Sequence, residues 1–160
     1  MKKWLITFGV VSGLCLLLLI WMINSLLYDQ YEVLELNWGI ELPQATEMKS
    51  LITTENSFHG DGEWFLLFEY SKPIDLTDSE FGKLSFEDIA HANNEIANFK
   101  RRTLEIRHND QAVVEVFKTY DVEAEVGDFY FYESRNGSYD TIVLLYKTST
   151  QQLFMYEWHQ

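Results

Sequence analysis

An uncharged, strongly apolar segment near the amino terminus limits what this chain can become more than any other feature of its sequence. The 25 residues from Trp4 to Tyr28 contain no charged side chain. As a helix rising about 1.5 Å per residue they would reach roughly 37 Å, more than the ~30 Å hydrocarbon core of a bilayer requires. We therefore predict that residues 1–28 form a cytoplasmic tip followed by a transmembrane helix.

The distribution of basic residues predicts the orientation of this helix. Lys2 and Lys3 precede the apolar segment, and the next basic residue is Lys49. Because Lys and Arg collect on the cytoplasmic side of a membrane span, we expect a cytoplasmic amino terminus. The chain is thus predicted to be a single-pass protein of the cell membrane, with residues 29–160 as one extracytoplasmic domain.

Two further features of the apolar segment concern processing and packing. Leu14 precedes Cys15, where lipoprotein processing expects a small residue, and residues 24–27 lack the small-x-small pattern of signal peptidase sites. Both features favour retention as an anchor, with cleavage as the open alternative. Gly9 and Gly13 form a G-x-x-x-G pattern, which would let two membrane helices approach closely and form a homodimer.

The predicted extracytoplasmic domain is strongly acidic. It holds all 25 Asp and Glu residues against 10 Lys and Arg residues, a net formal charge of −15. Such a surface repels nucleic acid and anionic lipid, and it would attract a cationic protein or peptide. The sole cysteine, Cys15, lies in the apolar segment, so this domain has no disulfide and no thiol nucleophile.

The hydrophobic pattern after the anchor predicts an α+β fold, a mostly antiparallel sheet of about six strands with a helical insertion. Alternating apolar residues and turn signals predict strands over residues 31–42, 47–55, 63–70, 128–133, 139–147 and 152–158. The last three should form an antiparallel meander. The insertion is expected to contain helices over residues 77–84, 85–107 and 111–120. Ser85 and Asp88 nearly match a capping box. A hairpin within residues 103–117 is the alternative to the last helix.

A glycine-rich turn between two predicted strands carries the best candidate for chemistry. His59, Asp61 and Glu63 place an imidazole and two carboxylates within five residues. Such groups could coordinate a divalent cation or act as general acid and base. Asp61-Gly62 is also a common reverse-turn sequence, so a purely structural turn is the competing interpretation.

Two stretches of the sequence carry a resemblance to a known group. They are the His59-Gly60-Asp61-Gly62 turn and the aromatic meander that begins at Gly127-Asp128-Phe129-Tyr130-Phe131. Both resemble small exported proteins of Gram-positive bacteria, which are membrane-anchored or lipoprotein-like. The resemblance implies an exported location and this fold, and it implies no particular activity. Lys147 and His159 depart from the pattern, and these departures weigh against cation binding in the meander.

These observations predict a membrane-tethered, non-enzymatic binding or regulatory module that acts outside the cytoplasm and needs no cofactor. The sequence has no G-x-S-x-G, H-E-x-x-H, Walker or dinucleotide-binding motif. Two alternatives remain open. One is a hydrolase or cation-dependent enzyme that uses His59, Asp61 and Glu63. The other is an immunity-type protein that protects against a cationic toxin or peptide.

Overall fold

The computed structural model describes residues 30–54 and 61–160, and it divides the chain into two compact units, residues 1–42 and 43–160. The predicted membrane span with Gly9 and Gly13 lies outside the described residues, as does His59. Within the described ranges, no helix combines the length and the apolar character that crossing a bilayer requires.

In the first unit, residues Gln30–Trp38 form helix α2, so the strand predicted over residues 31–42 is wrong. Leu34 and Trp38 are buried, whereas Leu36 between them is 72% exposed. Two buried residues four apart satisfy both the helical and the strand period, which is why alternation misled the prediction. Gly39 ends the helix with a φ of 72°, and its N–H donates to the Glu35 carbonyl at 2.8 Å.

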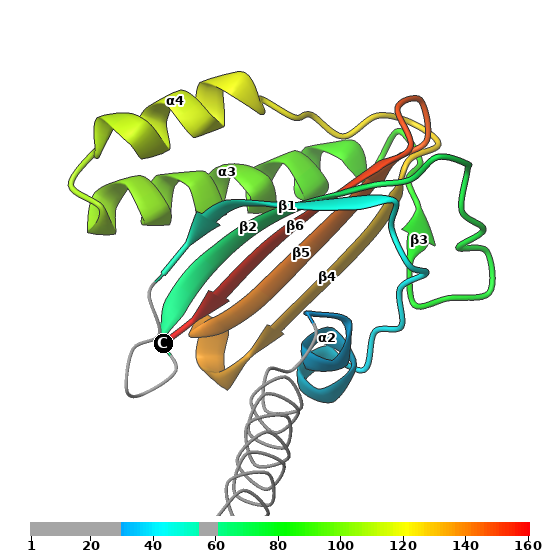
Figure 1. The fold of residues 1–160 in the computed structure, drawn as a ribbon, viewed down its shortest axis with the longest axis horizontal. Helices are drawn as coiled ribbons and strands as arrows, with labels where there is room; N and C mark the ends of the chain where they lie inside the picture. The colour runs from blue at the N-terminus through cyan, green and yellow to red at the C-terminus, as the bar shows by residue number, and fades with distance from the viewer. Residues whose placement is uncertain (1–29, 55–60) are drawn as a thin grey trace, which may run out of the picture. The chain divides into compact units, whose positions relative to one another are not determined.

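The second unit is built on one six-stranded antiparallel sheet with the order β1-β2-β6-β5-β4-β3 (Figure 1). The strands are β1 (Glu47–Thr53), β2 (Gly62–Glu69), β3 (Gly82–Lys83), β4 (Phe129–Arg135), β5 (Asp140–Lys147) and β6 (Gln152–His159). The α+β class, the antiparallel sheet and the meander β4–β6 are therefore confirmed. The sixth strand is β3, in place of the strand predicted over residues 31–42.

The segment from residue 77 to 84 was predicted to be helical and is not. Asp75 Oδ1 accepts hydrogen bonds from the Thr77 N–H at 3.0 Å and the Thr77 hydroxyl at 2.5 Å, and Ser79 Oγ donates to the Leu76 carbonyl at 2.7 Å. These side-chain bonds hold turns that compete with a helix. The segment then runs into β3, which pairs with β4.

The helical insertion is confirmed, with two helices over one face of the sheet (Figure 1). They are α3 (Ile89–Ile106) and α4 (Gln111–Thr119), so the helix prevails over the alternative hairpin. Asp88 Oδ2 accepts from the Ser85 N–H at 3.1 Å, which is one half of the expected capping box. Asp110 caps α4, since its carboxylate accepts from the Ala112 N–H at 2.8 Å.

The hydrophobic core lies between these helices and the sheet. Phe65 of β2 and Tyr156 of β6 are directly paired across the strands and stack at 4.5 Å between ring centroids. Phe99 of α3 packs edge-on against Tyr156 at 5.3 Å. Glu63 and Trp158 are also directly paired, two residues along the strands from Phe65 and Tyr156. Because residues two apart in a strand share a face, Glu63 and Trp158 lie on the same helix-covered face. Glu63 and the indole of Trp158 therefore face the helices α3 and α4.

Candidate functional site

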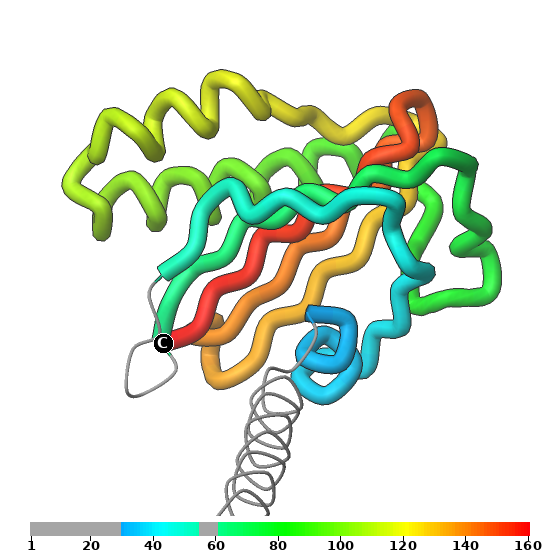
Figure 2. The backbone as a smooth tube through the Cα atoms, viewed as in Figure 1, coloured from blue at the N-terminus to red at the C-terminus, as the bar shows by residue number. Residues whose placement is uncertain are grey.

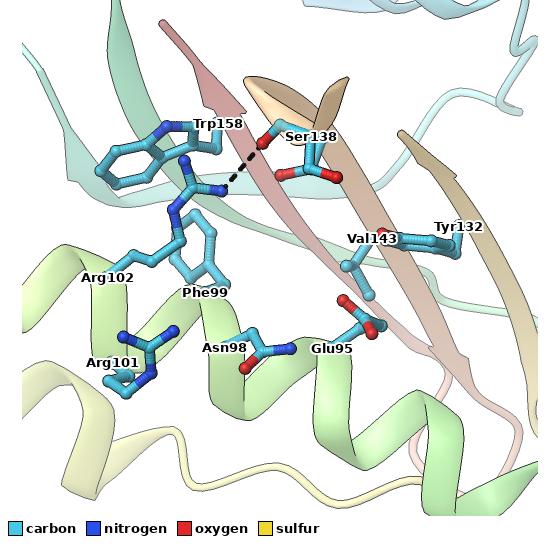
Figure 3. Close-up of a pocket in the computed structure, with 10 residues that line it drawn as sticks. Glu95, Asn98, Phe99, Arg101, Arg102, Tyr132, Ser138, Val143 and Trp158 are labelled. Carbon is cyan, nitrogen blue, oxygen red and sulfur yellow. Dashed lines mark hydrogen bonds between the residues drawn. The ribbon is translucent and has the colours of Figure 1, made fainter. Parts of the chain in front are cut away.

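A pocket with a volume of about 320 Å³ opens between α3 and the strands β4, β5 and β6 (Figure 3). Its walls combine aromatic rings with charged and amide groups, which come from α3, β4, β5, β6 and the turn between β4 and β5. They are Glu95, Asn98, Phe99, Arg101, Arg102, Tyr132, Ser138, Thr141, Val143 and Trp158. Small-molecule sites are usually concave, with a few polar groups that fix the orientation of the ligand. This pocket is more polar than that, since seven of its ten lining residues are polar or charged.

Arg102 marks one end of the pocket. Its guanidinium carbon lies 4.5 Å from the centroid of the Trp158 ring, and Nη1 donates to the Ser138 carbonyl at 3.3 Å. The stacked indole fixes the plane of the guanidinium. Burial, followed by the positive charge of Arg101, lowers the pKa of Arg102 from its ordinary value.

Arg102 differs from the other arginines in its lack of a carboxylate partner. Arg101 pairs with Glu105 at 3.0 Å, Arg135 pairs with Glu133 at 2.5 Å, and Arg107 pairs with Glu63. No carboxylate of residues 30–54 or 61–160 forms a salt bridge with Arg102. A partly buried guanidinium without a carboxylate partner can form charge-assisted hydrogen bonds with an anionic group of a ligand.

Glu95 marks the other end of the pocket, and its one ion-pair neighbour among the described residues is a histidine. Its side chain is 18% exposed, His91 Nδ1 lies 3.9 Å from its Oε1, and the Asn94 amide donates to the same oxygen at 3.4 Å. Among the residues described by the structure, no Lys or Arg forms a salt bridge with it. The negative charge of Glu95 also acts on Tyr130. Burial is the main cause that raises the pKa of Tyr130, and the charge of Glu95 is the second.

The pocket's hydroxyl groups are not arranged for nucleophilic catalysis. Ser138 Oγ accepts from Ser134 Oγ at 3.2 Å, and in the described part of the chain no hydroxyl of this pocket is bonded to a histidine or a carboxylate. A serine nucleophile needs a base within hydrogen-bond distance. What the pocket shows is one basic and one acidic side chain at its two ends, Arg102 and Glu95.

The residues of the predicted glycine-rich turn are placed differently. Glu63 is buried on the helix-covered face, where its carboxylate accepts from Arg107 Nε and, at 2.8 Å, from Thr54 Oγ1. Asp61 is exposed, and His59 lies outside the described residues. In the ranges 30–54 and 61–160, no group of three His, Cys, Asp or Glu residues could hold a metal ion. A cation site at this turn stays a prediction.

Gly62 within this turn is required for space. A Cβ atom at Gly62 would lie 2.9 Å from Thr54 Cβ and 2.9 Å from the Trp64 ring. Its φ does not fall in the left-handed region, and the residue is the first of β2. The turn alone therefore does not explain Gly62, because close packing against Thr54 and Trp64 also requires a residue without a side chain here.

Lys147 and His159, which depart from the resembled pattern, both occupy ion-pair clusters. Lys147 Nζ lies 2.7 Å from Asp128 Oδ2 and 2.8 Å from Glu125 Oε2. His159 Nε2 lies 2.8 Å from Glu157 Oε1, and this bond is the main cause that raises the pKa of His159. Both clusters are internally paired and act as structural elements.

A second pocket, of about 340 Å³, is more acidic but less suited to a ligand. Asp121, Glu123 and Glu125 line it, with Lys147. Asp121 already pairs with Lys100 at 2.8 Å, and Glu125 already pairs with Lys147 at 2.8 Å. Two of the three carboxylates of this pocket are thus already paired, whereas neither Arg102 nor Glu95 has a permanently charged partner among the described residues, and the pocket beside α3 is the better candidate.

The sequence interpretation missed this pocket, although one signal for it was present. Glu95, Asn98 and Arg102 follow one another at positions i, i+3 and i+7 of α3, beside the buried stripe that contains Phe99. This spacing places three polar groups on one face of a helix. Trp158, which completes the wall, is too distant in sequence for such a pattern to reveal it.

Comparisons with protein-family models, with curated proteins and with solved structures found no match to this chain. The assignment of a function therefore depends on the geometry of the pocket and on the charges within it.

Proposed function

We propose that this chain is a membrane-tethered, non-enzymatic module that binds a small ligand outside the cytoplasm, in the pocket between α3 and the sheet. The observation that carries the proposal is one pocket with two opposite charges, Arg102 without a carboxylate partner and Glu95 without a Lys or Arg partner among the described residues. An unpaired, partly buried charge costs stability. A ligand that supplies the missing partners would recover this cost on binding.

The rival proposal, an enzyme that uses the glycine-rich turn, has less support. Glu63 would have to act as a ligand or base, yet its carboxylate is bonded to Arg107 and Thr54. Its release would leave Arg107 without its carboxylate partner. The net charge of −15 on residues 29–160 supports binding in another way, because it attracts ligands and proteins that carry a cationic group.

The tethered topology is tested by protease treatment of intact cells whose wall has been removed. Because Lys2 and Lys3 are the only basic residues near the apolar segment, residues 29–160 should lie outside. Protease should degrade this part and leave a fragment of a few kilodaltons that contains the anchor. Full protection of the chain in intact cells, with digestion only after lysis, would show that the proposed location is wrong.

The pocket is tested by filling it. Asn98 lies on α3 between Glu95 and Arg102 and points into the pocket (Figure 3), so Asn98→Trp should occupy the space of a ligand. The full chain in detergent is screened by thermal shift against amino acids, di- and tripeptides, oligolysine and sugars. A ligand at 100 times its Kd should stabilise the wild type by about 2.7 kcal/mol, and this effect should vanish in Asn98→Trp.

Ala97→Trp is the control, because Ala97 is an exposed residue of the same helix and is not part of the pocket wall. It should respond to the ligand as the wild type does. The proposal fails if no probe of any class stabilises the wild type, or if the same probe stabilises Asn98→Trp equally.

A further inference from the structure

The two charged ends of the pocket are held at a fixed separation. Glu95 and Arg102 both lie on α3, seven residues apart, and both line the pocket. At about 1.5 Å per residue, their backbone positions are roughly 10 Å apart along the helix axis. Figure 3 shows the Arg102 guanidinium beside Trp158, with Glu95 at the opposite end.

We infer that this pocket binds a short peptide of two or three residues with both termini free, its carboxylate at Arg102 and its ammonium at Glu95. The inference rests on the proposed function and names the class of ligand. An extended chain advances about 3.3–3.6 Å per residue, so two residues span about 7 Å and three about 10 Å, which fits within the roughly 10 Å between the two backbone positions.

The Arg102 end suits a carboxylate. A guanidinium has five N–H donors, and Nη1 donates to the Ser138 carbonyl at 3.3 Å. The ring of Trp158, 4.5 Å away, holds the guanidinium plane in place. A planar, pre-oriented guanidinium binds a carboxylate through two parallel hydrogen bonds.

The Glu95 end suits an ammonium group. Its Oε1 receives a hydrogen bond from Asn94 at 3.4 Å, and it has no salt bridge to a Lys or Arg of the described residues. An ammonium group supplies three donors and a full positive charge. With the side chain 18% exposed, this pairing would be less screened by solvent than one on the surface.

The middle of the pocket suits a peptide group. Asn98 lies between the two charged residues, and its amide can accept from a peptide N–H and donate to a peptide carbonyl. Phe99, Val143 and Trp158 provide apolar wall for small side chains. The volume of about 320 Å³ is large enough for a short peptide with small side chains.

Isothermal titration calorimetry on the full chain in detergent micelles tests this inference. The probes are trialanine with free termini, N-acetyl-trialanine and trialanine amide, which differ only in one terminal charge. We expect each blocked peptide to bind at least tenfold more weakly than the free peptide. Phosphoethanolamine, a zwitterion with closer charges, should bind weakly. Tighter binding of phosphoethanolamine than of trialanine would assign the pocket to a lipid headgroup and overturn the inference.

Two variants assign each terminus to its residue. Arg102→Gln should bind trialanine and its amide equally while still discriminating against the acetylated peptide. Glu95→Gln should show the reverse. Arg135→Gln and Glu115→Gln are matched controls, since both residues are exposed and neither lines the pocket, and they should behave as the wild type.

The outcomes separate this inference from the proposed function. If trialanine fails to bind, or blocked peptides bind as tightly as the free one, the peptide assignment is wrong. The proposed function survives that result when another probe stabilises the wild type and not Asn98→Trp. If Arg102→Gln or Glu95→Gln does not fold, the comparison of free and blocked peptides on the wild type still tests whether the pocket binds a peptide through both termini.

Discussion

Replacement of Arg107 by Met is expected to lower the free energy of unfolding by about 3 kcal/mol, because it leaves the buried Glu63 carboxylate without its ion-pair partner. The side chain of Glu63 is 5% exposed, and Arg107 provides its ion pair. Thr54 Oγ1, at 2.8 Å, would remain as a hydrogen-bond donor without charge. Arg107 also donates to the Thr53 carbonyl at 3.1 Å, so its loss removes a hydrogen bond at the end of β1 as well.

Urea denaturation of the full chain, followed by tryptophan fluorescence, measures this effect. Arg101→Met is the matched control, because Arg101 pairs with Glu105 on the surface, where the side chains are 58% and 62% exposed. Exposed pairs contribute about 0–1 kcal/mol. The double variant Glu63→Leu/Arg107→Met should regain most of the loss, since it leaves no unpaired buried charge. Equal losses in Arg101→Met and Arg107→Met would contradict a structural role for the pair.

Replacement of Asp128 by Ala is expected to cost still more, about 4 kcal/mol. Asp128 is 1% exposed, and its carboxylate accepts from the Thr148 N–H at 3.1 Å and from the Glu125 N–H at 2.9 Å. It also pairs with Lys147 at 2.7 Å. The substitution therefore leaves two backbone donors and a buried ammonium group without this acceptor.

The same denaturation measurement applies to Asp128→Ala, with Asp121→Ala as its control. Asp121 pairs with Lys100 at 2.8 Å, but its side chain is 71% exposed, so its loss should cost less than 1 kcal/mol. Asp128→Asn should fall between the two, because the amide oxygen can still accept one bond. A cost for Asp128→Ala that does not exceed that of Asp121→Ala would show that the buried cluster does not stabilise the fold.

The parts of the fold that the sequence predicted are those with a long, unambiguous period. The buried stripe of α3 repeats at helical spacing, and the strands of the meander are apolar runs between turn residues. The errors fell where the pattern fitted two structures or where side chains hydrogen-bond to the backbone. Leu34 and Trp38 fit both periods, and in residues 77–84 the side-chain hydrogen bonds of Asp75 and Ser79 favour turns.

The candidate site was less predictable because its residues meet only in three dimensions. The sequence interpretation grouped Glu63 with Asp61 and His59 because they are neighbours in the chain. Strand alternation instead puts Glu63 on the face of Phe65, where Arg107 reaches it from the end of α3. Arg102 and Trp158 likewise come together only when α3 packs on β6. No local pattern contains such a pairing.

The position of β6 has a consequence for the order in which this chain can fold during synthesis. β6 lies between β2 and β5, so it joins the hairpin β1–β2 to the strands β4 and β5 (Figure 2). It is also the last of these six strands in chain order, so it is synthesised after the other five. Until then the inner edge of β2 has no neighbour, and exposed strand edges invite pairing with other chains. The sheet closes, and the wall of the pocket at Trp158 forms, in one late event.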